Sequence, residues 1–370
     1  MKLLIISHTP HYYNTGQKVV GLAPTVLEIN HLSATFYQII HIGVLYRKEK
    51  APAGFIPYAN SNIHFVPIPP HGGKTFTAKL RILLLLPKIL YIIIKALQKS
   101  DVYQFRAPTS IGVLVIPFLT IFSNKKGWYK YAGNWTQKKP PLSYAFQRWW
   151  LSRMQNRKVT INGTWPNLPV HCLPFENPCL EEKDIKKGKQ IVQNKIYRLP
   201  LVLCFVGRIE SAKGVKRILE AIAQHPHPEW FRTIHMIGNG PDSDTFNRQA
   251  ETSPVPIIFH GTLDRKQVFQ IYEQSHILLL PSDSEGFPKV IAEAANFGCI
   301  PVTSKISSIN QYVTEAMGYL WEPGKESFPH FFRRIDFTNG NLAAKAEYSK
   351  NLARSFTFTH YIEHIKKEVL

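Results

Sequence analysis

The sequence has few cysteines, and their positions exclude two common kinds of stabilised fold. Four cysteines occur in 370 residues. None forms a C-x-x-C pair or stands beside a histidine cluster at metal-ligand spacing, so neither a disulfide framework nor a structural zinc site is expected. Reduced thiols in a cytosol fit this pattern better. With 44% hydrophobic and 19% charged residues, intrinsic disorder is excluded as well.

Long uninterrupted apolar runs are also missing. Pro87 and Lys88 interrupt Ile82–Leu97, which therefore falls short of the ~20 residues that a membrane-spanning helix needs. Ile111–Phe122 is shorter and is predicted to be buried core. The N-terminal MKLLIISHTP lacks the h-region and cleavage site of a signal peptide, and it predicts a first β-strand. We therefore expect a cytoplasmic protein.

Acidic residues are scarce in the first half of the chain. Residues 1–180 hold 21 Lys and Arg against 4 Asp and Glu, a net charge of +17, whereas residues 181–370 hold 24 against 21. The first half should therefore carry a positive field that attracts an anionic partner. Nucleic acid, an acidic membrane surface and a phosphorylated substrate are the candidates, and charge alone does not separate them.

Internal repeats are absent, and the recurring pattern is a short apolar strand, a turn and a helical segment. This pattern predicts parallel sheets with helices on both faces, in two doubly wound domains that face a cleft. The expected strands of the first domain are Leu3–Ile6, Phe36–Ile42, Ile63–Ile68, Val102–Phe105, Trp128–Tyr131 and Lys158–Ile161. Those of the second are Leu201–Val206, Thr233–Ile237, Ile257–Phe259, Ile277–Leu280, Ile300–Thr303 and Tyr319–Trp321.

A charged stretch separates the two predicted domains. The segment EEKDIKKGK follows Pro174 and Pro178, and this change of composition marks the boundary. We expect a first domain over residues 1–178, a linker over 179–198 and a second domain over 199–345. A further helix is predicted over residues 355–370.

Two segments of the first half have features of membrane-interface helices. On a helix, the cations around Ile82–Leu97 fall on one stripe: Arg81, Lys88, Lys95 and Lys99. This is either a packing helix that shows its lysines to water or an interfacial helix on anionic lipid. The segment Pro140–Lys158 places Trp149 and Trp150 among arginines, and it fits interfacial contact and an ordinary surface equally well.

The strongest chemical motif is PSDSEGFPKVIAEAANFGC, which follows the strand Ile277–Leu280. Pro288 suits the first helical position, where free amides, the helix dipole and Lys289 would form an anion pocket. Glu285 and Glu293 would lie about 12 Å apart if both were helical. That spacing suits an elongated ligand such as a nucleotide-sugar. The alternative is that Glu285 favours the helix N-terminus and Glu293 is solvated.

Two further motifs follow strands of the second domain. In VGRIESAKGVKR, Arg208 and Lys213 stand in a strand-to-helix turn, where they can neutralise a diphosphate, or they belong to a solvated basic loop. In MIGNGPDSD, the turn Gly238–Pro241 is a weak signal by itself. Asp242 and Asp244 spell a carboxylate pair that could hold a metal, but they are read here as helix-capping residues, so no metal site is expected.

Together, GR-x4-KG, G-x-GP, FHG and EGFPKVIAEA, in this order over Leu201–Val302, resemble the donor domain of the retaining glycosyltransferases of family 4, also called glycosyl transferases group 1. The resemblance implies the GT-B fold, with two Rossmann-like domains, an acceptor-binding first domain and a nucleotide-sugar-binding second domain. It also implies that the C-terminal helix returns to the first domain. It covers about half of the chain tightly and the first half only in outline.

The family pattern implies a role for each matching residue. Arg208 and Lys213 would hold the donor diphosphate, Glu285 would contact the donor sugar near its 3-hydroxyl, and Glu293 would bind the ribose. Backbone amides of Gly286 and Phe287 would approach the sugar and the phosphate. Further donor-binding positions are Gly207, Gly238, Gly240, Pro241, Pro288 and Lys289, and Phe259–Leu263 would border the nucleotide.

The first half departs from the commonest family pattern. In place of a pair of adjacent glycines, HTPHYYNTGQKVVG offers only Gly16 for a close approach to phosphate. The loop after the fifth strand reads YAGNW, so Gly133 and Asn134 stand where many members have a histidine, and Asn134 could bind a sugar hydroxyl. Arg106 directly follows a strand, where it suits a phosphorylated acceptor or an ion pair with a neighbouring loop.

The sequence therefore predicts a retaining, metal-independent hexosyltransferase. It would transfer a sugar from UDP- or GDP-sugar to a lipid-linked, possibly polyprenyl-diphosphate-linked, saccharide in bacterial surface-polysaccharide assembly. The expected setting is the inner, anionic face of the cytoplasmic membrane, with no cofactor and no nucleic acid. The alternatives are a nucleotide-sugar 2-epimerase of the same fold and a basic nucleic-acid-binding protein.

Overall fold

The chain divides into two compact units. The computed structural model describes residues 1–72, 76–339 and 341–370, without the side chains of residues 48–50 and 76–81. Unit 1 consists of Met1–Glu176 and Ile362–Leu370, and unit 2 consists of Asn177–Tyr361. Residues 179–198, which were expected to be a linker, belong to unit 2 and contain a helix of 13 residues, α5 (Glu182–Asn194).

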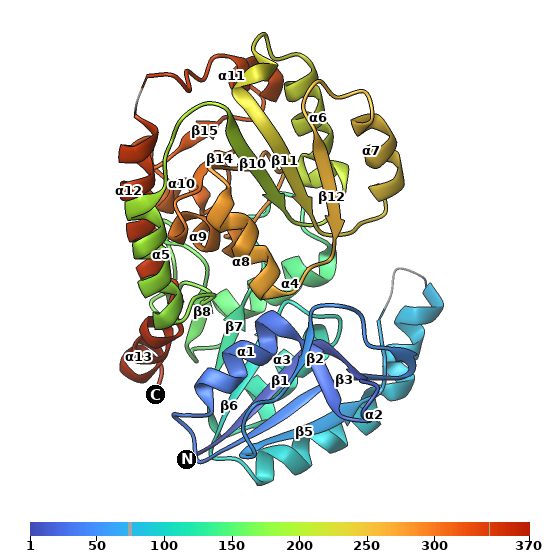
Figure 1. Ribbon diagram of the computed structural model, residues 1–370. Helices are drawn as coiled ribbons and strands as arrows, with labels where there is room; N and C mark the ends of the chain where they lie inside the picture. The colour runs from blue at the N-terminus through green and yellow to red at the C-terminus, as the bar shows by residue number, and fades with distance from the viewer. Residues whose placement is uncertain (73–75, 340) are drawn as a thin grey trace. The chain divides into compact units, whose positions relative to one another are not determined.

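Unit 2 is built on a six-stranded sheet, and all five pairings in it are parallel (Figure 1). Its strand order is β12-β11-β10-β13-β14-β15. The strands are β10 (Leu201–Val206), β11 (Phe231–Ile237), β12 (Ile257–Gly261), β13 (Ile277–Leu280), β14 (Ile300–Ser304) and β15 (Tyr319–Trp321). In order along the unit this is 3-2-1-4-5-6, the order of a dinucleotide-binding fold, with its switch point between β10 and β13.

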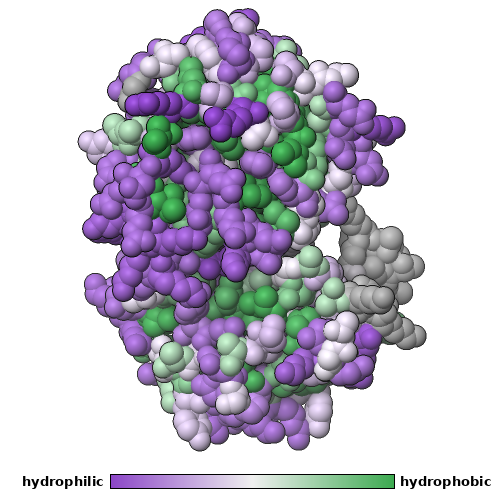
Figure 2. Space-filling view, in the orientation of Figure 1, coloured by the Kyte–Doolittle hydropathy of each residue, from purple (hydrophilic) through white to green (hydrophobic). Residues whose placement is uncertain are grey.

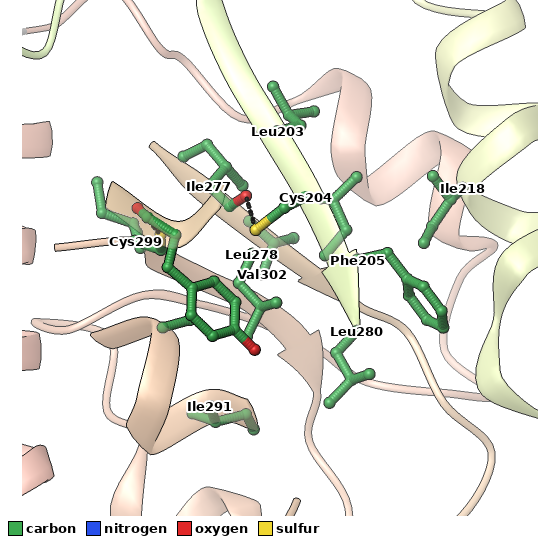
Figure 3. Packing of buried hydrophobic residues seen from close by; sticks show 14 of the residues in the cluster. Leu203, Cys204, Phe205, Ile218, Ile277, Leu278, Leu280, Ile291, Cys299 and Val302 are labelled. Carbon is green, nitrogen blue, oxygen red and sulfur yellow. Dashed lines mark hydrogen bonds between the residues drawn. The ribbon is translucent and has the colours of Figure 1, made fainter. Parts of the chain in front are cut away.

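The strands of unit 2 are apolar because helices cover both faces of the sheet. The sequences LVLCFV of β10 and ILLL of β13 lack the alternation that one solvated face would require. Figure 3 shows Cys204 of β10 beside Ile277 of β13, where its thiol donates to the carbonyl of Ile277 over 3.5 Å. All six strands predicted from the sequence are present, each with bounds within two residues of the expected ones.

Nine α-helices and two 3-10 helices connect these strands in the described part of unit 2, counting α13, which continues into unit 1. Besides α5 they are η1 (Ser211–Lys213), α6 (Val215–Ala223), η2 (Pro228–Trp230), α7 (Ser243–Ala250), α8 (Arg265–Gln274), α9 (Lys289–Asn296), α10 (Ile309–Tyr312), α11 (Phe328–Arg333), α12 (Leu342–Arg354) and α13 (Phe358–Glu368). Helix α5 begins with a capping box between Glu181 and Asp184 and packs against α9 and α12. Its outer face is charged, and Figure 2 shows a hydrophilic surface over it.

Unit 1 contains a nine-stranded sheet with seven parallel strands, in the order β5-β3-β1-β6-β7-β8-β9. The strands are β1 (Lys2–Tyr13), β2 (Val19–Leu22), β3 (Gln38–Lys50), β4 (Phe55–Pro57), β5 (Ile63–Ile68), β6 (Val102–Ala107), β7 (Lys126–Tyr131), β8 (Val159–Ile161) and β9 (Cys172–Pro174). The antiparallel strands β2 and β4, together with β9, were not predicted from the sequence.

The first strand has 12 residues, three times the four that the sequence suggested, and this places Gly16 in a turn between two strands. The residues expected to form a loop after Ile6 continue β1 to Tyr13 and then pair with β2. Gly16 therefore lies in an exposed hairpin turn, where its amide donates to the side-chain oxygen of Asn14 over 3.0 Å. Gly16 still precedes the first helix, α1 (Ala23–Leu32), but β2 intervenes, and its expected approach to phosphate stays a prediction.

The helices of unit 1 are α1 (Ala23–Leu32), α2 (Phe76–Gln98), α3 (Gly112–Phe122), α4 (Leu142–Arg153) and the larger part of α13. Helix α3 buries Val115, Ile116 and Leu119 but exposes 61% of Ile121 and 72% of Phe122, so the prediction that it is wholly core is only partly right. The side chain of Arg81, part of the predicted basic stripe, lies outside the described residues. Within the described residues, no helix has the length and apolar character required to cross a bilayer.

Candidate functional site

The strongest candidate site lies at the carboxyl ends of β10 and β13, the two strands on either side of the switch point in unit 2. β10 leads into residues 207–214, and β13 leads into residues 281–288. Because the two strands pair in parallel, their following loops lie at the same edge of the sheet. The motifs that the sequence singled out are therefore brought together by the topology, although more than 70 residues separate them.

Backbone contacts fasten these two loops together. The amide of Asp283 donates to the carbonyl of Ala212 over 2.9 Å. Gly214 has φ +85°, and a Cβ on it would lie 2.2 Å from the carbonyl oxygen of Pro281, so only glycine fits there. On α6, Arg217 donates to Pro281 O over 2.9 Å and also binds the carboxylate of Asp283. Sequence reasoning missed Arg217, whose only signal is its position one turn after the Lys213-Gly214 pair.

The loop after β11 packs against the loop after β10 just as closely. Gly207 donates to the carbonyl of Ile237 over 3.0 Å. A Cβ on Gly238 would lie 1.9 Å from the oxygen of Gly207, and one on Gly240 would lie 2.2 Å from the oxygen of Ile209. The G-x-G pattern is therefore required by this close approach of two backbones. Pro241 follows in the same turn and leads to α7.

Asp242 has a different contact from the one that its sequence position suggested. It occupies the N-cap position of α7, but its side chain makes no capping hydrogen bond. Its carboxylate instead accepts from the amide of Ser211 over 3.1 Å, which ties the loop after β11 to η1. Among the described residues, neither Asp242 nor Asp244 belongs to a group of three side chains spaced to hold a metal.

The two cations expected at the diphosphate differ in their surroundings. Arg208 follows β10 with 67% of its side chain exposed, and its guanidinium lies 3.3 Å from the carboxylate of Glu210. Lys213 ends η1 with only 26% of its side chain exposed, and its Nζ lies 2.6 Å from Oε1 of Glu285. Glu285 itself is 10% exposed. The predicted loop residues Lys213 and Glu285 therefore form a partly buried ion pair.

The start of α9 provides backbone donors. Pro288 is the N-cap and not the first helical residue, one position away from the expectation. In the described part of the chain, the amides of Gly286 and Phe287 donate no hydrogen bond. The Phe287 ring is buried against Phe356, with centroids 4.5 Å apart, so only its backbone is available. Ser308, which sequence reasoning missed, holds this loop by donating to Gly286 O over 2.6 Å.

Lys289 does not extend toward the predicted anion pocket. Its ammonium donates to the carbonyl of Pro178 over 2.8 Å, at the start of unit 2. The expected contribution of its side chain to the pocket is therefore replaced by a contact that anchors the residues before α5. The amides at the start of α9 and the helix dipole remain as the positive features of this loop.

Glu293 lies one turn further along α9. Burial raises the pKa of its carboxyl, and the cations of Arg265 and Lys289 partly offset that increase. No described residue forms a hydrogen bond or ion pair with the Glu293 carboxylate. An unpaired, half-buried carboxylate that follows an amide-rich loop is available to accept hydrogen bonds from a ligand.

The candidate residues of unit 1 are engaged within that unit. Arg106 forms two hydrogen bonds with Glu28 of α1, of 3.1 and 3.2 Å. Lys130 of β7 also donates to both oxygens of Glu28, each over 2.8 Å. Glu28 is fully buried, so Arg106 belongs to a buried cluster of two cations and one anion. The ion pair is with a helix and not with a neighbouring loop.

The loop after β7 has a defined turn. The side-chain oxygen of Asn134 accepts from the amide of Thr136 over 3.1 Å, and this bond shapes the loop. A Cβ on Gly133 would lie 3.1 Å from the ring of Pro108, because the loops after β6 and β7 are neighbours. The expected contact of Asn134 with a ligand hydroxyl thus competes with its role in the turn.

The donor motifs coincide with a known family. Residues 186–335 match the family model described as glycosyl transferases group 1. These residues form a group 1 glycosyltransferase domain. The domain is similar to an uncharacterised 41.2 kDa protein in the cps region of Klebsiella pneumoniae, with 21% identity over 136 residues, 37% of this chain and 36% of that protein. It is also 28% identical over 129 residues to the sulfoquinovosyl transferase SQD2 of Arabidopsis thaliana, 34% of this chain and 24% of that one.

The chain thus spans only 36% of the length of the Klebsiella protein and 24% of the length of SQD2.

Solved structures match over the whole chain at low identity. Alr3699/HepE of Anabaena in complex with UDP has a TM-score of 0.67 and 15% identity, and 99% of each chain is covered. The lipopolysaccharide outer core galactosyltransferase WaaB has a TM-score of 0.67 and 16% identity, covering 100% of this chain and 99% of that one. The group 1 domain therefore belongs to a chain with the GT-B fold, as the sequence predicted.

Proposed function

We propose that this protein is a retaining, metal-independent glycosyltransferase. It transfers a hexose from a UDP- or GDP-sugar to a lipid-linked saccharide during polysaccharide biosynthesis. The observation that carries this proposal is the meeting of the loops after β10, β11 and β13 at the switch point of unit 2, with glycines where backbones touch. The UDP bound by the structurally similar HepE supports a uridine or related nucleotide as donor.

The donor diphosphate would lie against the β10 loop and the start of α9. Arg208, Lys213 and the unpaired amides of Gly286 and Phe287 supply positive charge and hydrogen-bond donors there. Glu293 would accept hydrogen bonds from the ribose, because its carboxylate has no partner among the described residues. Glu285 would contact the sugar near its 3-hydroxyl.

The reaction breaks the bond between the sugar and the diphosphate. Positive charge then develops on the sugar ring and negative charge on the leaving diphosphate, which the donors around Lys213 stabilise. On a same-face route, a leaving phosphate oxygen takes the proton of the acceptor hydroxyl. This route fits the chain because Glu28, one of the few carboxylates in the first half, is held by two cations and is a poor nucleophile.

The acceptor is proposed to be anionic because of the surface of unit 1. A groove of about 1040 Å³ is lined by three tryptophans from separate segments: Trp135, Trp149 and Trp165. Lys138, Arg148 and Arg153 also line it, and no Asp or Glu does so among the described residues. Indole faces suit sugar rings or an isoprenoid chain, and the cations suit phosphate. The Trp-Arg segment thus lines a concave groove.

The exposed face of α2 is proposed to contact the membrane surface. Leu84 is 77% exposed, Tyr91 is 61% exposed and Leu83 is 57% exposed, which is unusual for apolar side chains on one helix. The ammonium of Lys95 lies 5.4 Å from the centre of the Tyr91 ring. An apolar face with lysines beside it is the composition of helices that lie in the headgroup region of anionic bilayers.

A ligand panel followed by product analysis tests the proposal. UDP, GDP and their sugars would be compared by thermal shift, and one nucleotide series should raise the melting temperature. Incubation of the matching nucleotide-sugar with a membrane lipid extract should yield a lipid-linked glycoside whose anomeric configuration equals that of the donor. Formation of an epimer from the donor alone, or inversion of the anomeric centre, would contradict the proposal.

A further inference from the structure

Unit 1 contains a second, smaller cavity of about 360 Å³ that no motif pointed to. It is bordered by β1 at His8, by the chain after β5 at His71 and Gly72, and by the chain after β6 at Ser110. Tyr46 of β3 also lines it. The cavity therefore lies just beyond the carboxyl ends of β5 and β6, which is where doubly wound sheets bind their ligands, and the longer strands β1 and β3 continue past it.

His71 presents an unused hydrogen-bond acceptor at this cavity. The ring is 5% exposed, and its Nδ1 lies 2.8 Å from the carbonyl oxygen of Pro69. A carbonyl can only accept, so Nδ1 carries the proton and Nε2 of the neutral ring carries a lone pair. Nε2 is buried and has no hydrogen-bond partner among the residues that the structure describes. Buried polar atoms are nearly always paired, so Nε2 is the atom of this cavity wall at which a bound hydroxyl group would gain a hydrogen bond.

The other walls of the cavity are polar but uncharged. Ser110 Oγ and His8 Nδ1 share a hydrogen bond of 3.2 Å. Burial lowers the pKa of His8 to about 4 and also lowers that of His71, so both rings are neutral at pH 7. No Asp, Glu, Lys or Arg lines this cavity among the described residues. Hydroxyl and imidazole groups without a net charge match a neutral polyol better than a phosphate.

The wall after β6 is held in place from α4. The buried side chain of Gln147 accepts from the amide of Thr109 over 3.0 Å and donates to its carbonyl over 2.8 Å. Both hydrogen bonds fix the backbone directly before Ser110. Gly72 fits against this wall, because a Cβ on it would lie 2.9 Å from Ser110 Oγ. The cavity is thus preformed, as small-molecule sites usually are.

We infer that this cavity binds a neutral sugar ring of the acceptor, with a ring hydroxyl donating to Nε2 of His71. The inference rests on the proposed function, because it assigns the cavity to the acceptor side of the same reaction. His71, His8 and Ser110 then select an uncharged saccharide unit, whereas the cationic groove beside α4 takes the anionic part of the acceptor. The two sites adjoin along α4, since Tyr144 lines the cavity and Ala145 lines the groove.

Binding of simple probes tests this inference in the full-length protein. Methyl hexopyranosides and glucose 1-phosphate would be titrated by saturation-transfer NMR against wild type, His71→Phe, His71→Gln and Ser110→Ala. His64→Phe, at an exposed position of neighbouring strand β5, is the matched control. Loss of one hydrogen bond to a buried acceptor should weaken binding of the best methyl hexoside about tenfold in His71→Phe.

His71→Gln keeps an acceptor near Nε2 and should retain more affinity than His71→Phe, which a merely structural role would not produce. Equal hexoside affinity in wild type and His71→Phe would overturn the inference, and so would a His71→Phe variant that loses binding of glucose 1-phosphate but not of the neutral hexosides. UDP and GDP binding, measured by calorimetry in the same samples, should stay unchanged. Absence of nucleotide binding in wild type would contradict the proposed function and leave the hexoside result to decide this inference by itself.

Discussion

The ammonium of Lys213 lies 2.6 Å from Oε1 of Glu285 and joins the loops after β10 and β13. Both side chains are mostly buried, so the pair is screened less than a surface ion pair would be. A diphosphate that reached Lys213 would compete with Glu285 for its protons and would leave the Glu285 carboxylate able to accept from a sugar hydroxyl. The ion pair therefore couples the two residues that the sequence assigned separately to the phosphate and to the sugar.

Lys213→Ala should lower kcat by about a hundredfold or more, because it removes a preorganised donor from the leaving diphosphate. The effect should appear mainly in kcat if Lys213 acts on the charge that develops in the transition state. Initial rates of glycoside formation at several donor concentrations would measure it. Lys216→Ala is the matched control, since Lys216 forms an exposed pair with Glu220 at 3.7 Å on α6. Equal losses in both variants would remove Lys213 from the site.

Glu293→Ala should weaken nucleotide binding, because the proposed ribose hydrogen bonds involve a charged acceptor. Such bonds contribute about 1.5–3 kcal/mol, which corresponds to a loss of roughly ten- to a hundredfold in affinity. Isothermal titration calorimetry with the preferred nucleoside diphosphate would measure this change. Glu251→Ala, at the exposed end of α7, should bind as wild type does. Unchanged affinity in Glu293→Ala would contradict the ribose role.

The parallel sheet of unit 2 could be predicted almost completely from its sequence. A short apolar run that is followed by a turn, such as ILLL, predicts a buried strand with few alternative structures. The motifs then indicate which strands lead into the candidate site. The pairing of Lys213 with Glu285 could not be predicted, because strand order decides which loops become neighbours and the sequence does not state that order. The direction of the Lys289 side chain was predicted wrongly, because the local sequence does not reveal its hydrogen bond to the carbonyl of Pro178, 111 residues away.

Unit 1 was harder to predict because its polar residues are buried in networks. The segment after Ile6 contains His8, Thr9, Pro10 and His11, which looks like a loop, yet it continues β1. His11 is fully buried, and its ring is accommodated because Gly21 and Gly43 leave space where a Cβ would clash. The hydrogen bonds of the His11 ring and of Glu28 could not be predicted, because the neighbouring residues in the sequence show no pattern that indicates them.

Glu28→Gln should destabilise unit 1 strongly. The substitution removes the buried carboxylate that Arg106 and Lys130 share. Loss of one partner from a buried ion pair lowers the free energy of unfolding by about 3–5 kcal/mol. Urea unfolding followed by circular dichroism should show a lower midpoint. Asp101→Asn is the control, because Asp101 is exposed and its carboxylate accepts from the backbone amide of Lys2 over 2.7 Å. Similar midpoints for the two variants would mean that the cluster does not stabilise the unit.

Chelation should leave turnover intact if the reaction needs no metal. The carboxylate of Asp242 already accepts a hydrogen bond from the amide of Ser211. Asp244 lies in the first turn of α7, where an acidic residue stabilises the helix. Glycoside formation would be measured after dialysis against EDTA, with and without added Mg²⁺ or Mn²⁺. A metal site at Asp242 and Asp244 would be supported if EDTA abolished turnover and if Mg²⁺ or Mn²⁺ then restored it. The Asp242→Asn variant should in that case also lose turnover.

Acidification should destabilise unit 1 through buried histidines. Burial lowers the pKa of His11 to about 4 and holds that of His41 well below 6.5, and both rings bind Tyr58. The unfolded chain therefore binds more protons than the folded one, so the stability is present above pH 6.5 and is lost as the pH falls toward 4. Each group with this shift contributes about 1.4 kcal/mol per pH unit in that window. Urea midpoints between pH 7.5 and 4.5 would measure how the free energy of unfolding changes with pH. His11→Phe should reduce this slope, whereas His64→Phe, at an exposed position, should leave it unchanged. A flat profile in wild type would mean that these rings do not titrate on unfolding.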